Sequence, residues 1–182
     1  MKFKKEKWIV RGSKYAYSDP WIRLRIDKVI RSNGLKGVYS VAEIKGGIGV
    51  VPVAYDKKIV IVGQYRYAPD VYSWEIPKGA FSKFGSKEDP LVTAKRELEE
   101  ETGITAGKWQ KITMVHTLLG SANDKVYLFL ARDLKLGKPH PEKTETINIR
   151  RVSFKMFFEM VKKEEITDAT SIVAVALAEK LL

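Results

Sequence analysis

Residues 88–104 read Glu-Asp-Pro-Leu-Val-Thr-Ala-Lys-Arg-Glu-Leu-Glu-Glu-Glu-Thr-Gly-Ile. This stretch carries its own helix boundaries, because Asp89 is a good N-cap, Pro90 suits the first turn and Gly103 suits the left-handed residue after the last turn. We therefore expect a helix over residues 90–102. At about 100° per residue, one stripe of this helix is apolar and packs inward; it is formed by Leu91, Ala94, Leu98 and Thr102.

Three glutamates lie on the shoulder of the same helix. Glu97 and Glu101 are side by side, and Glu100 lies further round. One interpretation is a solvated acidic face balanced by Lys95 and Arg96, since like charges at this spacing cost only about 0.2–0.5 kcal/mol per exposed pair. The other is a site for a hard divalent cation, which prefers carboxylate oxygens and keeps positions open for water and phosphate. Charge alone does not decide between them.

The wider pattern favours the metal site. After Glu88 and seven further residues, the chain reads Arg-Glu-Leu-Glu-Glu-Glu-Thr-Gly-Ile over residues 96–104. This resembles the box of the Nudix hydrolase family: Gly, five residues, Glu, seven residues, then Arg-Glu-aliphatic-any-Glu-Glu-any-Gly-aliphatic. Ser82 stands at the position of the family's first glycine, and the nearest equivalent, Gly79, precedes Glu88 by three residues more than the family's spacing. We therefore expect an enlarged loop before the helix.

Sequence on both sides of the box resembles the branch that contains ADP-ribose and nucleoside-diphosphate-sugar pyrophosphatases. The similar stretches are Gln64-Tyr65-Arg66, Trp74-Glu75-Ile76-Pro77-Lys78-Gly79, residues 128–134 and residues 165–169. Two places depart from this branch. Lys78 stands where Ala is usual, and residues 118–124, Leu-Leu-Gly-Ser-Ala-Asn-Asp, stand where many ADP-ribose enzymes carry Ser-Pro-Gly and then a Glu.

The resemblance implies a fold and an activity. The fold is α/β of the α+β kind: a Nudix-type α/β/α sandwich with a mixed central sheet, plus an N-terminal β unit. The activity is metal-dependent hydrolysis of the diphosphate bond of ADP-ribose or another nucleoside diphosphate sugar, giving a nucleoside monophosphate and a sugar phosphate. Two alternatives stay open: a hydrolase of dinucleoside polyphosphates or other ADP compounds, and a non-catalytic nucleotide- or RNA-binding module. The complete set of box carboxylates argues against the module.

The resemblance also assigns metal ligands. It implies Mg²⁺ or Mn²⁺ held by Glu97, Glu101 and Glu100, with the main-chain carbonyl of Lys78 as a further ligand. Composition agrees with an oxygen-rich site, because the chain has no cysteine and only two histidines. Thiolate zinc sites and histidine-rich sites are therefore excluded.

The expected catalytic group contains two carboxylates and an arginine. In the resembling branch a glutamate on a mobile loop activates the attacking water, and Glu145, just before a strand expected at residues 147–152, matches that position. A box glutamate, Glu100, is its rival. Arg96 is expected to orient Glu97 or to pair with Glu88; the alternative is an ordinary ion pair on the helix surface.

Three further residues are candidate substrate contacts. Arg66 follows a strongly apolar strand at residues 59–65, so we expect it to emerge at a sheet end. The resemblance favours a substrate-binding role for Arg66, near Trp74 and Glu75, over an ordinary exposed arginine. Trp74 is a candidate for stacking on a nucleobase, although a tryptophan beside a strand is more often packed in a core.

With this resemblance, we expect the chain to divide into an N-terminal β unit at residues 1–45 and a Nudix hydrolase domain at residues 46–182. Strands expected at residues 21–29 and 37–44 form a hairpin. A hairpin is only marginally stable by itself, so we expect it to pack against another surface. In the resembling branch such strands pack across a two-fold axis, so we expect a homodimer. Further strands are expected at residues 49–54, 59–65, 109–117, 126–131 and 147–152, and helices at residues 154–163 and 168–182.

Charge and terminal sequence bear on partners and location. The net charge of +11 comes from scattered Lys and Arg residues, which favours a basic surface over a nucleic-acid-binding stripe. The N-terminus leads into no apolar run of signal-peptide length, and no stretch reaches the length of a membrane span. We therefore expect a cytoplasmic protein with no membrane partner.

Overall fold

A computed structural model describes residues 7–140 and 146–182 of the chain. Its strands and helices alternate in the order of a mixed α+β protein. The elements are β1 (Ile9–Ser18), β2 (Ile22–Ile30), β3 (Lys36–Ile44), β4 (Gly47–Pro52), β5 (Ile59–Arg66), β6 (Val71–Glu75), β7 (Lys78–Ala80), α1 (Pro90–Thr102), β8 (Ile104–Val115), β9 (Val126–Leu136), β10 (Asn148–Val152), α2 (Phe154–Lys162) and α3 (Ala169–Glu179).

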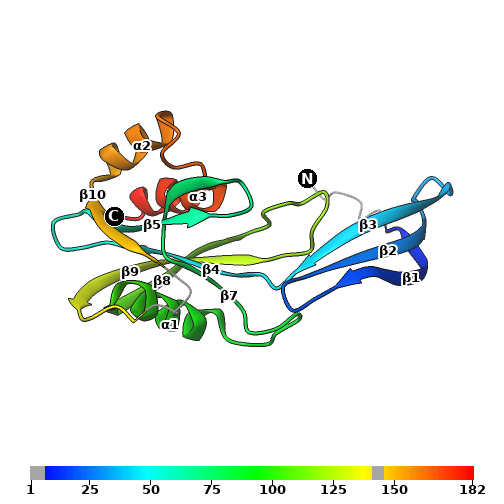
Figure 1. Cartoon of the computed structure of the whole chain (residues 1–182), viewed down its shortest axis with the longest axis horizontal. Coiled ribbons are helices and arrows are strands. Elements are labelled where there is room, and N and C mark those ends of the chain that lie inside the picture. The colour runs from blue at the N-terminus through cyan, green and yellow to red at the C-terminus, as the bar shows by residue number, and fades with distance from the viewer. Residues whose placement is uncertain (1–6, 141–145) are drawn as a thin grey trace.

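A four-stranded sheet forms the centre of the body, in the order β7-β4-β9-β8. β4 and β9 run parallel and the other pairs run antiparallel, so this sheet is mixed. Successive side chains of β4 point to opposite faces. Val50 packs with Ala94 and Leu98 of α1, whereas Val51 packs with residues of α2 and α3. Helices therefore cover both faces (Figure 1), and the expected α/β/α sandwich is confirmed.

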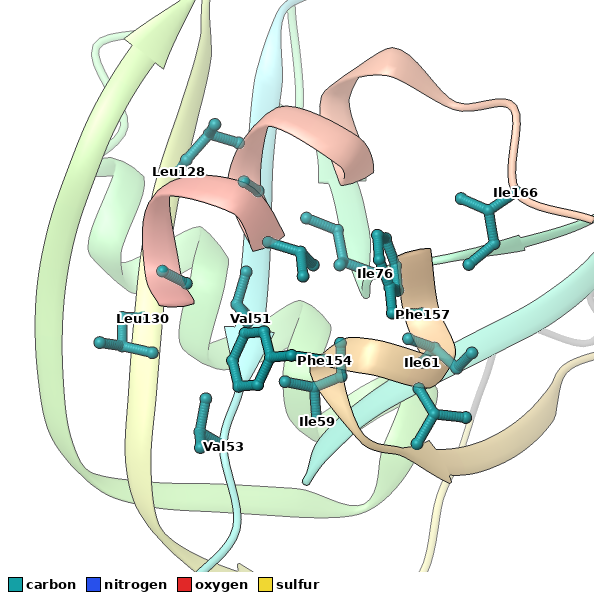
Figure 2. Packing of buried hydrophobic residues seen from close by; sticks show 14 of the residues in the cluster. Val51, Val53, Ile59, Ile61, Ile76, Leu128, Leu130, Phe154, Phe157 and Ile166 are labelled. Atoms are coloured by element: carbon teal, nitrogen blue, oxygen red, sulfur yellow. The ribbon is translucent and has the colours of Figure 1, made fainter. Parts of the chain in front are cut away.

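A second, antiparallel sheet in the order β10-β5-β6 completes the body. Ile59 and Ile61 of β5 point into the same apolar cluster as Val51 of β4 and Phe157 of α2 (Figure 2). An isolated bridge between Val53 and Ile59 connects β4 to β5 across their tight turn. The body therefore divides its strands between two hydrogen-bonded sheets that share one core.

Helix α1 begins and ends where the sequence predicts. The Asp89 side chain accepts a hydrogen bond from the Leu91 main-chain N–H, with an N···O distance of 2.9 Å. Gly103 is left-handed, with φ of 69°, and its N–H donates to the Glu99 carbonyl. The left-handed conformation is strained for residues with a side chain but not for glycine. Gly103 can therefore adopt it and end the helix sharply.

The N-terminal residues form a third sheet, β1-β2-β3, which projects away from the body (Figure 1). Strand β1 was not predicted. Its register against β2 shifts twice, between Val10 and Gly12 and between Tyr15 and Tyr17, so its side chains lack the regular alternation that identifies a strand. β1 is exposed along its whole length.

Main-chain hydrogen bonds attach β3 of this sheet to the connection between β8 and β9. The Ala42 N–H donates to the Ser121 carbonyl at 2.8 Å, and the Asn123 N–H donates to the Ala42 carbonyl at 3.3 Å. The Tyr39 hydroxyl also donates to the Gly120 carbonyl. On the enlarged loop before α1, the Phe84 ring lies 4.2 Å below the Arg23 guanidinium. The N-terminal sheet therefore contacts the body through two loops.

Other element boundaries differ modestly from the predictions. β8 begins at Ile104, directly after the helix cap, and β9 continues to Leu136, because these two strands extend together as one long antiparallel pair. The last helix, α3, ends at Glu179. Among residues 7–140 and 146–182, no helix has the length and apolar character needed to cross a membrane.

Candidate active site

Two box glutamates of α1 converge on the first residues of β7. Burial of Ala94 and Leu98 against the sheet places Glu97 and Glu101, one turn apart, at the edge of the helix that faces β7. Glu101 is buried, and its Oε2 accepts a hydrogen bond from the Lys78 main-chain N–H at 3.2 Å. A Cβ added to Gly79 would overlap the Glu97 carboxyl group. Glycine at position 79 therefore lets the carboxylate reach the main chain.

Arg96 connects two of the glutamates. Its Nη2 donates to Glu97 Oε1 at 2.6 Å, and its Nη1 donates to Glu100 Oε2 at 2.7 Å. Partial burial alone lowers the pKa of Arg96, but the charges of Glu97 and Glu100 outweigh this and raise it. The remaining box carboxylate, Glu88, accepts a hydrogen bond from the Ser82 N–H at 3.3 Å. Arg96 thus pairs with Glu97 and, one turn on, with Glu100, and its role in orienting Glu97 stays a prediction.

The glutamate cluster has the chemistry of a hard-cation site. Its donors are carboxylate oxygens, gathered where α1 approaches the main chain of Lys78 and Gly79, which suits Mg²⁺ or Mn²⁺. In the part of the chain that the structure describes, no three acidic or histidine side chains are already grouped around one point. Arg96 instead hydrogen-bonds Glu97 and Glu100. The residues fit such an ion in the type of their donor atoms, and their role as its ligands stays a prediction.

Arg66 and Glu75 form a two-point ion pair beside this cluster. Arg66 Nε donates to Glu75 Oε1 at 2.8 Å, and Nη2 donates to Oε2 at 2.7 Å. Burial raises the pKa of Glu75, but the hydrogen bonds from Arg66 and the charge of Lys78 outweigh it and hold that pKa below its usual value. The hydrogen bond to Glu75 raises the pKa of Arg66. Both groups are therefore charged at neutral pH.

The Lys78 side chain extends this pair to α3. Its Nζ lies 2.7 Å from Glu75 Oε2 and 2.9 Å from Asp168 Oδ2. Asp168 is the N-cap of α3, and its Oδ2 also accepts hydrogen bonds from the Ser171 N–H and hydroxyl. Burial raises the pKa of Asp168, but the charge of Lys78 and the Ser171 hydrogen bonds outweigh it, so the pKa lies below its usual value.

Trp74 lies on the opposite face of β6 from Glu75, because neighbouring residues of a strand alternate. Its ring packs edge-on against Tyr72, with centroids 5.9 Å apart, and Arg150 lies 5.9 Å from its centroid. The structure thus brings Arg66, Glu75 and Lys78 together and leaves Trp74 elsewhere. Contact between Trp74 and a nucleobase stays a prediction.

A cleft of about 460 Å³ opens beside these residues. Its lining combines the end of β3, the start of β4, the Lys78 segment and the N-terminus of α3; the residues are Ile44, Gly46, Gly47, Ile48, Arg66, Lys78, Gly79, Ala80, Thr117, Asp124, Val126, Asp168, Ala169 and Thr170. Asp124 is buried, and its Oδ2 accepts hydrogen bonds from the Thr117 N–H and hydroxyl. Its Oδ1 has no hydrogen-bond partner among the described residues. Asp124 Oδ1 is itself buried, so the structure does not open it to the cleft.

This site lies in the part of the chain that matches a known family. Residues 44–173 match the family model described as the NUDIX domain. The chain belongs to the Nudix family. The preceding residues, 8–42, match the model described as the nucleoside diphosphate sugar hydrolase N-terminal domain.

Similar proteins match most or all of the chain. An ADP-ribose pyrophosphatase of Bacillus subtilis (strain 168) is 33% identical over 177 residues, which is 96% of this chain and 93% of the relative. A methanol dehydrogenase activator of Bacillus methanolicus is 29% identical over 161 residues, covering 87% of this chain and 85% of the relative. A crystal structure of an ADP compounds hydrolase superposes with a TM-score of 0.83 at 18% identity, covering 100% of this chain and 96% of that one. The superposition shows the fold.

Sequence reasoning missed two groups of this Nudix site. The Lys78 side chain was not predicted to belong to the site, because the resemblance implies a role only for the Lys78 carbonyl. The available signal was the presence of a lysine where Ala is usual. Asp168 was not singled out, although an Asp directly before a helical stretch is an N-cap signal. Glu145 lies outside the described residues, so its predicted catalytic role has no structural placement.

Proposed function

We propose that this Nudix protein hydrolyses the diphosphate bond of ADP-ribose or a closely related nucleoside diphosphate sugar, with Mg²⁺ or Mn²⁺ as cofactor. The observation that carries the proposal is the convergence of Glu97 and Glu101 on the Lys78–Gly79 main chain, beside a cleft lined by Arg66. Similarity over almost the full length to a relative named ADP-ribose pyrophosphatase supports the substrate class.

The side chains divide the work of such a reaction. Glu97, Glu101 and Glu100, with the Lys78 carbonyl, are the groups that would hold the metal. When bound, the ion neutralises charge on phosphate oxygens and lowers the pKa of a coordinated water. Arg96 orients Glu97 and Glu100 through its two short hydrogen bonds. Arg66 retains N–H groups beyond the two that Glu75 accepts, and these bind substrate oxygens.

Residues 118–124 motivate a second candidate substrate class. They depart from the sequence usual in ADP-ribose enzymes, and they place Asp124 in the cleft with one unpartnered carboxylate oxygen. Other ADP compounds, dinucleoside polyphosphates included, are therefore the alternative substrates.

A substrate panel tests the function. ADP-ribose, other nucleoside diphosphate sugars and dinucleoside polyphosphates are incubated with the protein and Mg²⁺ or Mn²⁺, and products are identified by mass. We expect ADP-ribose to give AMP and ribose 5-phosphate, and exhaustive chelation to abolish turnover until metal is restored. Hydrolysis that persists in excess chelator, or no turnover of any diphosphate on the panel, contradicts the proposal.

The general base is proposed to be Glu145, with Glu100 as its rival. Glu145→Gln and Glu100→Gln remove a charge and preserve shape, so they form a matched pair. We expect Glu145→Gln to reduce kcat by about 100-fold or more while metal affinity changes little. Wild-type kcat in Glu145→Gln, together with a large loss in Glu100→Gln, assigns the base to the box.

We also propose that residues 1–45 form a dimerisation unit. Residues paired across β2 and β3 share a face, and this face carries exposed apolar side chains such as Ile22, Leu24, Val38 and Ile44. An exposed apolar sheet face of this kind is typical of a surface that packs against a partner. A second copy of the same sheet provides it, because a two-fold axis pairs identical surfaces.

Light scattering at micromolar concentration tests this assembly. The wild type should show twice the 20.7 kDa chain mass. Val38→Asp should give a monomer, whereas Val92→Asp on α1 should stay dimeric, since the two valines are 60% and 58% exposed and differ only in location. A wild-type monomer, or dissociation by both variants, rejects the proposed interface. A cytoplasmic location and the absence of a nucleic-acid partner stay predictions from the sequence.

A further inference from the structure

Lys78 acts in the site through both its main chain and its side chain. Its main-chain N–H donates to Glu101, one of the box glutamates. Its ammonium group lies between Glu75 and Asp168, on the wall of the cleft. The same residue therefore belongs to the glutamate cluster and to the ion-pair network with Arg66.

The two cations of this network lie close together. Arg66 Nη2 and Lys78 Nζ both lie 2.7 Å from the same atom, Oε2 of Glu75. Their nitrogen atoms are therefore separated by no more than two hydrogen-bond lengths. A pair of cationic groups at that spacing matches the oxygens of two adjacent phosphoryl groups.

Donor counts show what this wall offers to a ligand. An ammonium has three N–H donors, and Lys78 directs two of them to Glu75 and Asp168. A guanidinium has five, and two of those of Arg66 are bonded to Glu75. Both carboxylate oxygens of Glu75 accept hydrogen bonds from these cations, and Asp168 Oδ2 is bonded to Ser171 as well. The Arg66 and Lys78 side chains keep 38% and 23% exposure, so spare N–H groups remain accessible.

We infer that Lys78 and Arg66 together bind the diphosphate of the substrate, and that Lys78 makes the cleft favour a diphosphate over a monophosphate. This inference rests on the proposed function and deepens it. Glu75 holds both cations in place before the ligand arrives, so little side-chain ordering remains at binding. Glu101, which accepts a hydrogen bond from the Lys78 main-chain N–H, adds a further negative charge that acts on Arg66.

Binding of ADP and AMP, measured by calorimetry in excess chelator, tests the role of Lys78 without turnover. Wild type should bind ADP more tightly than AMP. Lys78→Met removes the charge and keeps most of the side-chain length, so the ADP-to-AMP affinity ratio should fall by about tenfold. Lys78→Arg should restore most of the ratio. Lys83→Met, an exposed lysine on the following loop, is the matched control and should leave the ratio unchanged.

A second variant separates ligand binding from a purely structural role. Asp168→Asn weakens the connection between Lys78 and α3, but its amide can still cap the helix and the ammonium remains beside Glu75. Asp168→Asn and Lys78→Met should both lower the melting temperature, and only Lys78→Met should lower the affinity ratio. The inference is overturned if Lys78→Met keeps the wild-type ratio, or if Asp168→Asn reproduces its loss. An absence of hydrolysis by wild type would instead reject the proposed function, and the nucleotide titrations would still report on Lys78.

Discussion

Strands β4 and β1 show how differently the two ends of this molecule are stabilised. Every residue of β4 is buried, because helices cover both faces of its sheet. Every residue of β1 is exposed, and its sheet projects beyond the body (Figure 1). The body thus buries its own apolar surface, whereas the N-terminal sheet is held by its hydrogen-bond ladder and a few loop contacts.

Polar clusters in the two regions repeat the contrast. On the N-terminal sheet, Arg25 donates to Asp27 and Glu43, and Tyr15 donates to Glu43 at 3.1 Å. The cleft wall uses the same ion-pair chemistry at Arg66, Glu75 and Lys78, but there the cations line a cavity. Similar ion pairs therefore stabilise a projecting sheet in one place and form part of a binding surface in the other.

The largest expected effect is a loss of turnover when the glutamate cluster of the body is changed. Glu97→Gln and Glu101→Gln each remove one charge from the carboxylate cluster while preserving shape, so kcat should fall by about 10³-fold with the circular dichroism spectrum unchanged. Glu99→Gln, on the exposed side of the same helix, should retain wild-type kcat. Equal losses in all three variants would show that general helix charge, rather than the cluster, supports turnover.

A pair of aromatic truncations compares the two regions in stability. Phe157 is fully buried in the body core (Figure 2), so Phe157→Ala should lower the free energy of unfolding by about 3–5 kcal/mol. Trp21 is 71% exposed on the N-terminal unit, so Trp21→Ala should change it by less than about 0.5 kcal/mol. Urea titrations at concentrations where the chain is monomeric provide the measurement. A comparable loss for Trp21→Ala would break the comparison, because the N-terminal unit would then carry its own core.

The smallest expected effect is a change in acid sensitivity. The pKa of Glu75 lies below its usual value, because Arg66 and Lys78 outweigh its burial. The stability it contributes is therefore complete above about pH 4, the usual carboxyl range, and is lost as pH falls through the lowered folded-state pKa. Glu75→Gln should be less stable at neutral pH and should lose less stability on acidification. Thermal melts between pH 7 and pH 3 test this, with exposed Glu99→Gln as control; parallel pH profiles for Glu75→Gln and wild type would contradict it.

Local signals explain which parts of the fold the sequence predicts. The bounds of α1 follow from Asp89, Pro90 and Gly103, whose effects act within a few residues. β1 escapes prediction because two register shifts disturb its alternation. In the site, the positions of Glu97 and Glu101 follow from helical spacing. Strand β6 was not predicted, so Trp74 and Glu75 were expected together near Arg66, and the structure places them on opposite faces of that strand.

Contacts between distant residues account for what the sequence did not predict. Lys78 and Asp168 meet only because β7 and the N-terminus of α3 flank one cleft, and no spacing rule connects residues so far apart in the chain. Thr117 and Asp124 are only seven residues apart, but their pairing likewise depends on how the connection between β8 and β9 folds back. A residue pattern shows which chemical groups are available, and the fold determines which of them share a cavity.

The attachment of β3 to the connection between β8 and β9 bears on how this protein evolves. Two of its hydrogen bonds join main-chain atoms of Ala42 to main-chain atoms of Ser121 and Asn123. Such bonds do not depend on the identity of a side chain. Residues 118–123 are therefore free to diverge while the loop keeps its anchorage. Natural selection can alter the sequence between Thr117 and Asp124, two residues that line the cleft, without dismantling the junction that carries the N-terminal sheet.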